Sequence, residues 1–225
     1  MRTRILVTVV GVLLGAVSAH AGLINGDFGT GDLSGWTRFT TGNGTLGPAD
    51  HVAVFDVGGG GVGSHSARFR VGQARYSPPD LEGGGIFQGV TLGAGALVIS
   101  ADIAAWAPWG NNNGGLFELL FDGRVVDSHD FGFIGGGGVG RASLGASFDV
   151  DAGAHEVRIR ITRPWAQNDN APLQFVDNVS LLGVELDPAI LEEPPTDPVP
   201  EPGSITLLGL GLLGLARARN ARRRV

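Results

Sequence analysis

The sequence contains no cysteine, and none of its 16 basic residues is a lysine. Without cysteine, the chain forms no disulfide bond, and it has neither a catalytic thiolate nor a cysteine-ligated zinc site. Without lysine, it lacks the phosphate-binding lysine of the P-loop motif G-x-x-x-x-G-K-[ST]. Cysteine-dependent enzymes and P-loop nucleotide-binding proteins are therefore excluded as functional classes.

Glycine, by contrast, is abundant: the chain has 39 glycines in 225 residues, well over twice the usual share of about 7%. The glycines show no collagen-like period. Glycine weakens helix interiors and permits tight turns, so this composition favours an all-β protein with many loops over a helical one. Hydrophobic residues make up 43% of the chain, which is enough for a packed core.

Motifs typical of enzymes lack the sequence context that they need. The sequence GGGGVG occurs at residues 58–63 and 135–140, and both copies match G-x-G-x-x-G by letter. In dinucleotide-binding proteins this motif opens a helix. Here SHSARFRV and RASLGASF follow the two copies, so both copies are predicted to be loops. The chain also has neither an H-E-x-x-H motif nor a G-x-S-x-G motif.

Four carboxylates gather around one predicted hairpin, and two interpretations of them are open. Such a cluster could supply a general acid and a general base, as in glycoside hydrolases. The alternative, which we favour, is an ordinary solvated hairpin face. We therefore predict that the protein is not an enzyme, and the four residues concerned are Glu118, Asp122, Asp127 and Asp130.

The first 21 residues have the pattern of a secretory signal peptide. Arg2 and Arg4 precede an apolar stretch over residues 5–17, and small residues stand at Ala19 and Ala21. This order of positive, apolar and small residues is typical of a cleaved export signal. The chain is predicted to pass through the secretion translocon, with cleavage after Ala21.

The C-terminal segment combines a short apolar run with clustered arginines. Residues 205–216 form a run that would span about 18 Å as a helix, which is short of the roughly 30 Å hydrocarbon core. Arginine side chains after the run can extend the effective span, and they favour a cytoplasmic location for this end. A marginal transmembrane segment is therefore predicted at about residues 203–216.

This segment resembles the PEP-CTERM sorting signal of Gram-negative bacteria, over residues 199–225. The resemblance rests on Val199, Pro200, Glu201 and Pro202, then a Leu/Gly-rich span, then an arginine cluster. It implies recognition by an exosortase, a membrane protease/transpeptidase, and a transient anchor in the inner membrane. The protein would then reach the cell surface or the extracellular matrix. The arginines concerned are Arg217, Arg219, Arg222, Arg223 and Arg224.

Residues 183–202 are predicted to be an extended stalk, because a stretch with six prolines and six acidic residues has too few apolar residues to form a core.

Charge also restricts the partners of the protein. Residues 22–202 hold nine arginines and all 22 acidic residues. A surface this acidic repels nucleic acid and anionic lipid, so we predict no nucleic-acid partner.

Residues 22–182 are predicted to form a jelly-roll-like antiparallel β-sandwich. The sequence HEVRIRIT (155–162) alternates apolar and charged residues, and LFELLFDGRVVDSHDF (116–131) is typical of a hairpin with an Asp122-Gly123 turn. ALVISADIAAW (96–106) indicates a longer buried strand. Such numerous short strands, divided by glycine-rich turns, are typical of a sandwich. Further strands are predicted at 23–28, 51–57, 65–71, 86–92, 146–150 and 175–182.

The two ends of this body resemble galactose-binding-like jelly rolls, which include several carbohydrate-binding modules. The resemblance rests on LINGDFGTGDLSGW (23–36) and FVDNVSL (175–181), and it predicts that Trp36 is a core residue. In that family the first and last strands often share a structural calcium ion. Asp177 matches the family's ligand position and Asp27 is a nearby oxygen donor, whereas Gly29 replaces an expected acid. Asp177 is therefore either a calcium ligand or a loop hydrogen-bond acceptor.

Two loops carry the side chains expected to bind carbohydrate. WAPWGNNNGG (106–115) and RPWAQNDNAP (163–172) each follow a predicted strand. Indole rings stack on sugar rings, and amides bond to hydroxyls, so the loops would form one site if they shared one rim. The alternative is that the tryptophans cap the core and the asparagines serve turns. The candidates are Trp106, Trp109, Asn111, Asn112, Arg163, Trp165 and Gln167.

Taken together, these features predict an exported, surface-sorted, non-catalytic protein that binds carbohydrate in the extracellular matrix, with exopolysaccharide as a partner. Two alternatives stay open. The body could be a structural or adhesive surface protein without sugar specificity, or, more remotely, a secreted hydrolase.

Overall fold

A computed structural model describes residues 23–48, 51–110, 112–168 and 170–183. Within these ranges the chain forms strands and turns, and no helix occurs. The predicted signal peptide, the stalk, the apolar run 203–216 and the sorting motif lie outside the described residues. Among the residues described, no helix is long and apolar enough to cross a membrane.

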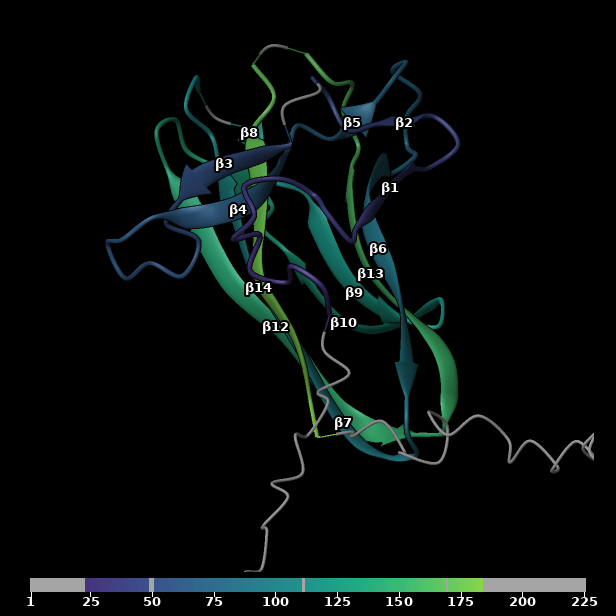
Figure 1. Cartoon of the computed structure of the whole chain (residues 1–225). Coiled ribbons are helices and arrows are strands. Elements are labelled where there is room, and N and C mark those ends of the chain that lie inside the picture. Colours follow the sequence, from purple (N-terminus) through teal and green to yellow (C-terminus); the bar gives the residue numbers. More distant parts are fainter. Residues whose placement is uncertain (1–22, 49–50, 111, 169, 184–225) are drawn as a thin grey trace, which may run out of the picture. The chain divides into compact units, whose positions relative to one another are not determined.

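Two five-stranded antiparallel sheets build the body (Figure 1). In the first sheet, the strand order is β1–β6–β13–β9–β10, and the bounds are Thr37–Thr40, Glu82–Leu92, Gly153–Arg163, Leu116–Phe121 and Arg124–Asp130. In the second sheet, the order is β12–β7–β14–β4–β3, and the bounds are Val139–Val150, Gly95–Trp106, Leu173–Leu182, Ser64–Phe69 and Val52–Phe55. The predicted all-β sandwich is thereby confirmed.

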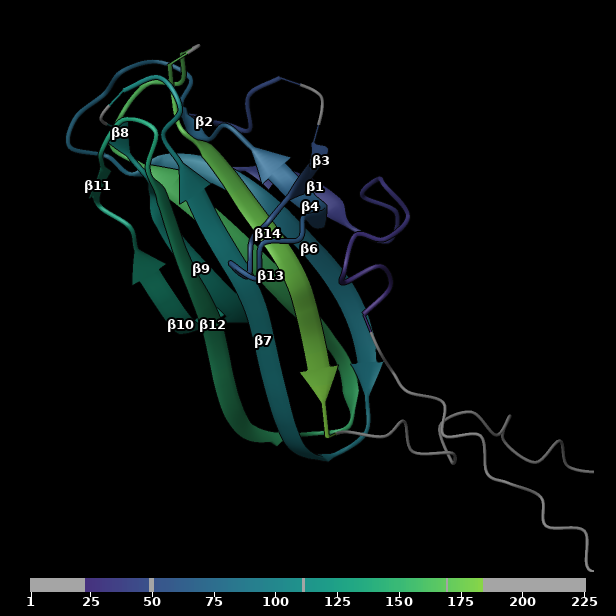
Figure 2. The ribbon, with the colours of Figure 1, turned by 90° about the vertical axis from the view of Figure 1, so that its left-hand side faces the viewer.

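Two short ribbons stand at one end of the sandwich. Strand β2 (Gly44–Thr45) pairs with β5 (Gly72–Gln73), and β8 (Asn112–Asn113) pairs with β11 (Phe133–Ile134). Figure 2 shows β12, β7 and β14 running side by side, with the ribbons β8–β11 and β2 beyond the same end of these strands. This end carries the loops that were expected to bind carbohydrate.

The core lies between the two sheets and follows the two-residue period of the strands. In β13, Val157, Ile159 and Ile161 are fully buried, whereas the intervening charged residues are only half-buried. The predicted alternation of this strand is therefore confirmed. The facing sheet contributes the odd-numbered residues of β7, among them Leu97, Ile99 and Ile103.

The predicted hairpin between β9 and β10 is also confirmed. Asp122 and Gly123 have φ angles of 49° and 76°, as a two-residue type I′ turn requires. A register shift between Val125 and Asp127 interrupts the pairing with β9. This irregularity lies in an edge strand, where bulges are common.

The predicted strand at residues 23–28 is wrong, because the structure has consecutive turns there. Asn25 and Phe28 adopt positive φ angles of 55° and 52°, which no strand accommodates. The Asn25 carbonyl accepts a hydrogen bond from Trp36 Nε1 at 3.0 Å. Phe28 and Trp36 then pack against each other in the core, with ring centroids 5.9 Å apart. The expected core position of Trp36 is confirmed.

Candidate functional site

The two loops expected to bind carbohydrate lie at the same end of the sandwich. The register pairs Trp106, the last residue of β7, with Leu173, the first residue of β14. It also pairs Arg163, the last residue of β13, with Glu82 at the start of β6. Because neighbouring strands are antiparallel, the β7–β8 loop and the β13–β14 loop emerge from one rim, beside β2, β5 and β8 (Figure 1).

A pocket of about 360 Å³ opens at this rim. Three of the seven candidate residues line it, namely Asn112, Arg163 and Trp165. Tyr76 and Asn168 also line the pocket. Asn168 belongs to the loop 163–172 that was predicted to bind carbohydrate, whereas Tyr76 lies outside both predicted loops. Tyr76 is the only tyrosine of the chain, but no pattern in the sequence places it beside a loop that lies about ninety residues away.

Tyr76 and Trp165 form an exposed aromatic platform. Their ring centroids are 5.9 Å apart, and the ring planes differ by only 9°. Tyr76 is 57% exposed and Trp165 is 43% exposed. Large aromatic side chains are seldom left exposed together, so a parallel pair at a pocket mouth is typical of a binding surface.

A buried glutamine holds the two halves of this platform together. Gln73 is fully buried, and its backbone N–H donates to the Trp165 carbonyl at 2.9 Å. Its side-chain Oε1 accepts a hydrogen bond from the Ser77 N–H, and its Nε2 donates to the Asp80 carbonyl, both at 2.6 Å. The loop that bears Tyr76 is therefore fixed against the strand end that bears Trp165.

Arg163 closes the floor of the pocket. It is 1% exposed, and its Nη1 donates to the Val71 carbonyl at 3.0 Å. Its Nη2 donates to Asn112 Oδ1 at 2.9 Å, while Asn112 Nδ2 donates to the Asn170 carbonyl at 2.8 Å. Burial lowers the pKa of Arg163 to about 10, because a low-dielectric surrounding disfavours the charged form.

The other described candidates, Trp106, Trp109 and Gln167, do not line this pocket. Trp109, which is 53% exposed, lines a separate pocket of about 280 Å³ with Arg68 and Leu173. The Arg70 guanidinium lies 5.1 Å from the centroid of its ring. Arg68 and Arg70 stand at the start of the segment that ends at Tyr76, so one stretch of chain borders both pockets.

Trp106 belongs to an apolar cluster on the outer face of the second sheet. Its ring stacks on Phe55 with centroids 6.0 Å apart, and Phe55 stacks on Phe175 at 3.8 Å. Gln167 does not line the Trp165 pocket, and its Nε2 donates to the Asn168 carbonyl at 3.3 Å. Asn111 lies outside the described residues.

Asp177, the residue matched to a calcium ligand, has protein donors on both oxygens. The Ser64 hydroxyl and the Asn178 N–H donate to it, and it is 1% exposed. Burial, together with the nearby charges of Asp102 and Asp27, raises its pKa despite these hydrogen bonds. Within the described ranges, no three His, Cys, Asp or Glu residues are placed to hold a metal. The calcium ion remains a prediction.

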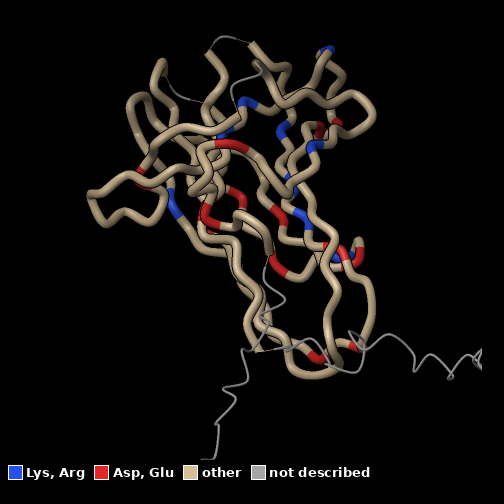
Figure 3. Tube along the Cα trace, in the orientation of Figure 1, with Lys and Arg blue, Asp and Glu red and all other residues tan. Residues whose placement is uncertain are grey.

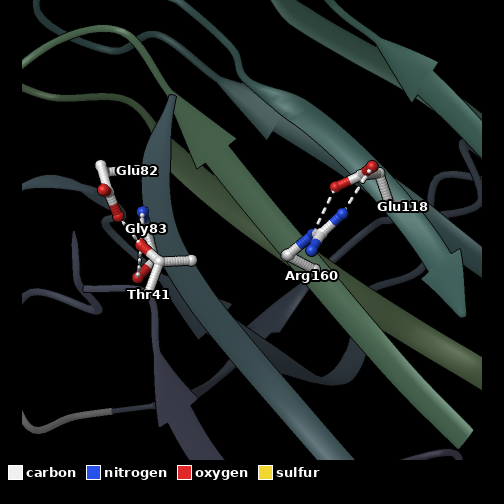
Figure 4. A network of polar contacts seen from close by, with 5 residues as sticks. All are labelled: Thr41, Glu82, Gly83, Glu118 and Arg160. Atoms are coloured by element: carbon white, nitrogen blue, oxygen red, sulfur yellow. Dashed lines mark hydrogen bonds and ion pairs between the residues drawn. The ribbon is translucent and has the colours of Figure 1, made fainter. Parts of the chain in front are cut away.

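Each carboxylate of the β9–β10 hairpin has a partner of its own. Arg160 binds both oxygens of Glu118, at 2.6 and 2.9 Å (Figure 4). Asp122 contacts His155 at 2.8 Å. Asp127 and Asp130 accept backbone N–H groups at 2.8 and 2.9 Å. Figure 4 also shows a contact between Thr41, Glu82 and Gly83 on the same sheet.

Comparison with known proteins identifies the C-terminal segment. Residues 198–224 match the model of the PEP-CTERM protein-sorting motif, which confirms the resemblance seen in the sequence. Such a motif implies an exported protein that is processed by an exosortase. No curated protein matches the chain.

The body has similarity to solved structures at low sequence identity. The carbohydrate-binding module TmCBM61, in complex with β-1,4-galactotriose, is 14% identical, with a TM-score of 0.41 over 70% of this chain and 94% of that chain. The CBM22-1 xylan-binding domain of Paenibacillus barcinonensis Xyn10C is 12% identical, with a TM-score of 0.37 over 72% and 92%. A cyclase from Fischerella sp. TAU is 16% identical, with a TM-score of 0.40 over 70% and 93%. The chain thus carries a PEP-CTERM protein-sorting motif that follows, in the sequence, a domain folded as an antiparallel β-sandwich.

Proposed function

We propose that this protein is sorted to the cell surface, where its sandwich binds polysaccharide through the pocket formed by Tyr76, Asn112, Arg163 and Trp165. The observation that carries the proposal is the exposed parallel pair of Tyr76 and Trp165 at the mouth of this pocket. A sugar ring has an apolar face that stacks on such rings. The neighbouring polar groups would bond to its hydroxyls.

The polar groups of the pocket suit this role, because they are already held in place. Asn112 is fixed between Arg163 and the Asn170 carbonyl. Asn168 lines the same pocket, and its Oδ1 accepts the Asn170 N–H at 2.9 Å. Side chains fixed before the ligand arrives lose little conformational entropy on binding. The pocket is therefore preorganised.

We propose that the protein has no catalytic activity. A glycoside hydrolase uses two carboxyl groups on either side of the scissile bond. The described residues that line the pocket are Tyr76, Asn112, Arg163, Trp165, Ala166 and Asn168, and none of these carries a carboxyl group. The hairpin carboxylates are engaged with partners of their own. A binding role in the extracellular matrix fits these observations better.

We propose Trp109 as a second contact for long polysaccharide chains. Its pocket and the Trp165 pocket border one segment, from Arg68 to Tyr76. A short oligosaccharide would occupy the Trp165 pocket alone, whereas a polymer would reach both. Trp106 packs against Phe55, so we assign it a structural role rather than a sugar contact.

The first test is affinity gel electrophoresis of the purified full chain in gels that contain the exopolysaccharide of its own host. Trp165→Ala should lower affinity about tenfold or more, because loss of a stacking ring costs about 1.4 kcal/mol or more. Trp109→Ala should weaken binding to the polymer but leave binding of short oligosaccharides unchanged.

Leu182→Ala is the matched control, because Leu182 is 62% exposed. It ends β14, about 30 Å along the strand from the pocket. This variant should bind like the wild type. If Trp165→Ala binds as well as the wild type, the pocket is not the site. If no polysaccharide retards the wild type, the body is a structural or adhesive domain instead.

A further inference from the structure

The floor of the Trp165 pocket holds a positive charge that no described carboxylate compensates. Arg163 is 1% exposed. Its Nη atoms donate to two neutral acceptors, the Val71 carbonyl and Asn112 Oδ1. Its Nε is buried without a hydrogen-bond partner. Throughout the part of the chain that the structure describes, no carboxylate forms an ion pair with it.

A guanidinium in this setting lacks the counterion that buried charges ordinarily have. Burial of a charge is unfavourable unless the charge is paired and hydrogen-bonded. The pKa of Arg163 falls only to about 10, so the side chain stays charged at neutral pH. An anion that enters the pocket would supply a charged partner for this largely buried side chain.

Among the described residues that line the pocket, no group would repel such an anion. Besides Arg163 these residues are Tyr76, Asn112, Trp165, Ala166 and Asn168, all of which are neutral. The amide groups and the phenol can donate hydrogen bonds. The pocket therefore combines one buried cation, several neutral donors and an aromatic platform.

We infer that the pocket binds the carboxylate of a uronic acid residue in an acidic polysaccharide. This inference rests on the proposed function and adds the chemical class of its ligand. A carboxylate is planar and matches the forked geometry of a guanidinium. A guanidinium binds a carboxylate more strongly than it binds a neutral oxygen. The ring of the same sugar would stack on Trp165, so one residue would satisfy both features of the pocket.

Because the body as a whole is strongly acidic, binding of an acidic polymer would depend on the local positive charge of Arg163. Residues 22–202 hold nine arginines against 22 acidic residues, so a polyanion is repelled at long range. Figure 3 shows both arginine and acidic segments among the upper loops, and only acidic segments at the opposite tip. Binding of an acidic polymer therefore requires a specific contact and cannot arise from general attraction.

The experiment compares acidic polymers with their neutral counterparts, using the full chain. Polygalacturonate, alginate and polyglucuronate are each tested beside the same polymer after carboxyl reduction. We expect at least one polyuronate to bind at least tenfold more tightly than its reduced form. Equal binding of every pair overturns the inference but leaves the proposed function intact. Binding of none, acidic or neutral, also overturns the inference, and the gels that contain the host exopolysaccharide then decide the proposed function separately.

Two variants test the role of Arg163 itself. Arg163→Gln removes the charge and should reduce polyuronate binding to the level of the neutral polymer. Because Arg163 is buried and its replacement can prevent folding, Asn112→Asp provides an independent test. It places a carboxylate beside Arg163 Nη2, so it should compete with the ligand and lower polyuronate affinity at least tenfold. Aspartate cannot donate to the Asn170 carbonyl as Asn112 Nδ2 does, so thermal unfolding is measured to verify that the variant is folded.

Arg75→Gln is the matched control for charge. Arg75 is exposed and adjacent to Tyr76, but it does not line the pocket. The Arg75→Gln variant removes one positive charge, as Arg163→Gln does, and should leave the preference for the acidic polymer unchanged. A preference that survives Asn112→Asp in a folded protein, or that is lost equally in Arg75→Gln, overturns the inference.

Discussion

At the scale of single residues, the pocket depends on how closely two backbones approach. Gly72 precedes the buried Gln73, and a Cβ atom at Gly72 would lie 2.7 Å from the Trp165 carbonyl oxygen and 2.9 Å from the Gln167 nitrogen. Both contacts are with backbone, which cannot rotate away. The absence of a side chain at this position therefore allows the Gln73–Trp165 hydrogen bond that sets the aromatic platform.

We therefore expect Gly72→Ala to disturb the pocket. The added methyl group would push the 163–167 segment away from β5, which should lower polysaccharide affinity and reduce the free energy of unfolding by about 1–3 kcal/mol. Isothermal calorimetry and denaturant unfolding measure the two effects. Gly89→Ala is the control, because its added Cβ would have only one neighbour, at 3.9 Å. Equal effects of both variants would contradict this account.

At the scale of secondary-structure elements, sequence patterns correctly predicted those features that depend only on neighbouring residues. The alternation of β13 and the Asp122-Gly123 turn depend on neighbouring residues, and the structure confirms both. The strand predicted at residues 23–28 is absent from the structure, because the apolar residues of this segment lie in turns and Phe28 has a positive φ angle. The partnership of Tyr76 with Trp165 was not predictable, because it depends on Gln73, which joins segments about ninety residues apart.

The β9–β10 turn is attached to β13 through a histidine whose charge state depends on pH. His155 contacts the Asp122 carboxylate at 2.8 Å and the Asp151 carbonyl at 2.9 Å. Burial alone would lower the pKa of His155, but the hydrogen bond to Asp122, helped by Asp151, outweighs it and raises the pKa. The protonated form therefore stabilises the fold. This contribution is complete below the unfolded value of about 6.5 and is lost as pH rises through the higher folded value.

We expect His155→Phe to be more destabilising at pH 5 than at pH 8. Phenylalanine keeps the ring that packs 5.0 Å from Phe121, so the difference between the two pH values reports the charge. Denaturant unfolding of wild type and variant at both values gives the measurement. Asp122→Asn should remove most of the same pH dependence. A destabilisation that is identical at pH 5 and pH 8 would show that His155 acts only through packing.

At the scale of the whole molecule, the sorting motif and the proposed binding site lie in different parts of the sequence. The sorting motif covers residues 198–224, whereas every residue of the proposed site lies between 76 and 168. The residues after Pro202 include five of the 16 arginines and none of the 22 acids. Their removal would leave a product more acidic by five charges. Such a product would repel polyanions more strongly at long range, so its binding to an acidic polymer would depend still more on specific contacts.

This separation predicts that sorting and binding fail independently. In the host, replacement of Glu201 and Pro202 by alanine should block exosortase processing, so the chain should stay in the cell envelope with its arginines. Isoelectric focusing and intact mass distinguish this form from the processed one, because cleavage near the motif removes five positive charges. The retained protein should still bind polysaccharide, whereas Trp165→Ala should be processed normally and bind weakly. Normal processing of the Glu201, Pro202 double variant would contradict a role for the motif, and loss of binding in it would show that the tail belongs to the site.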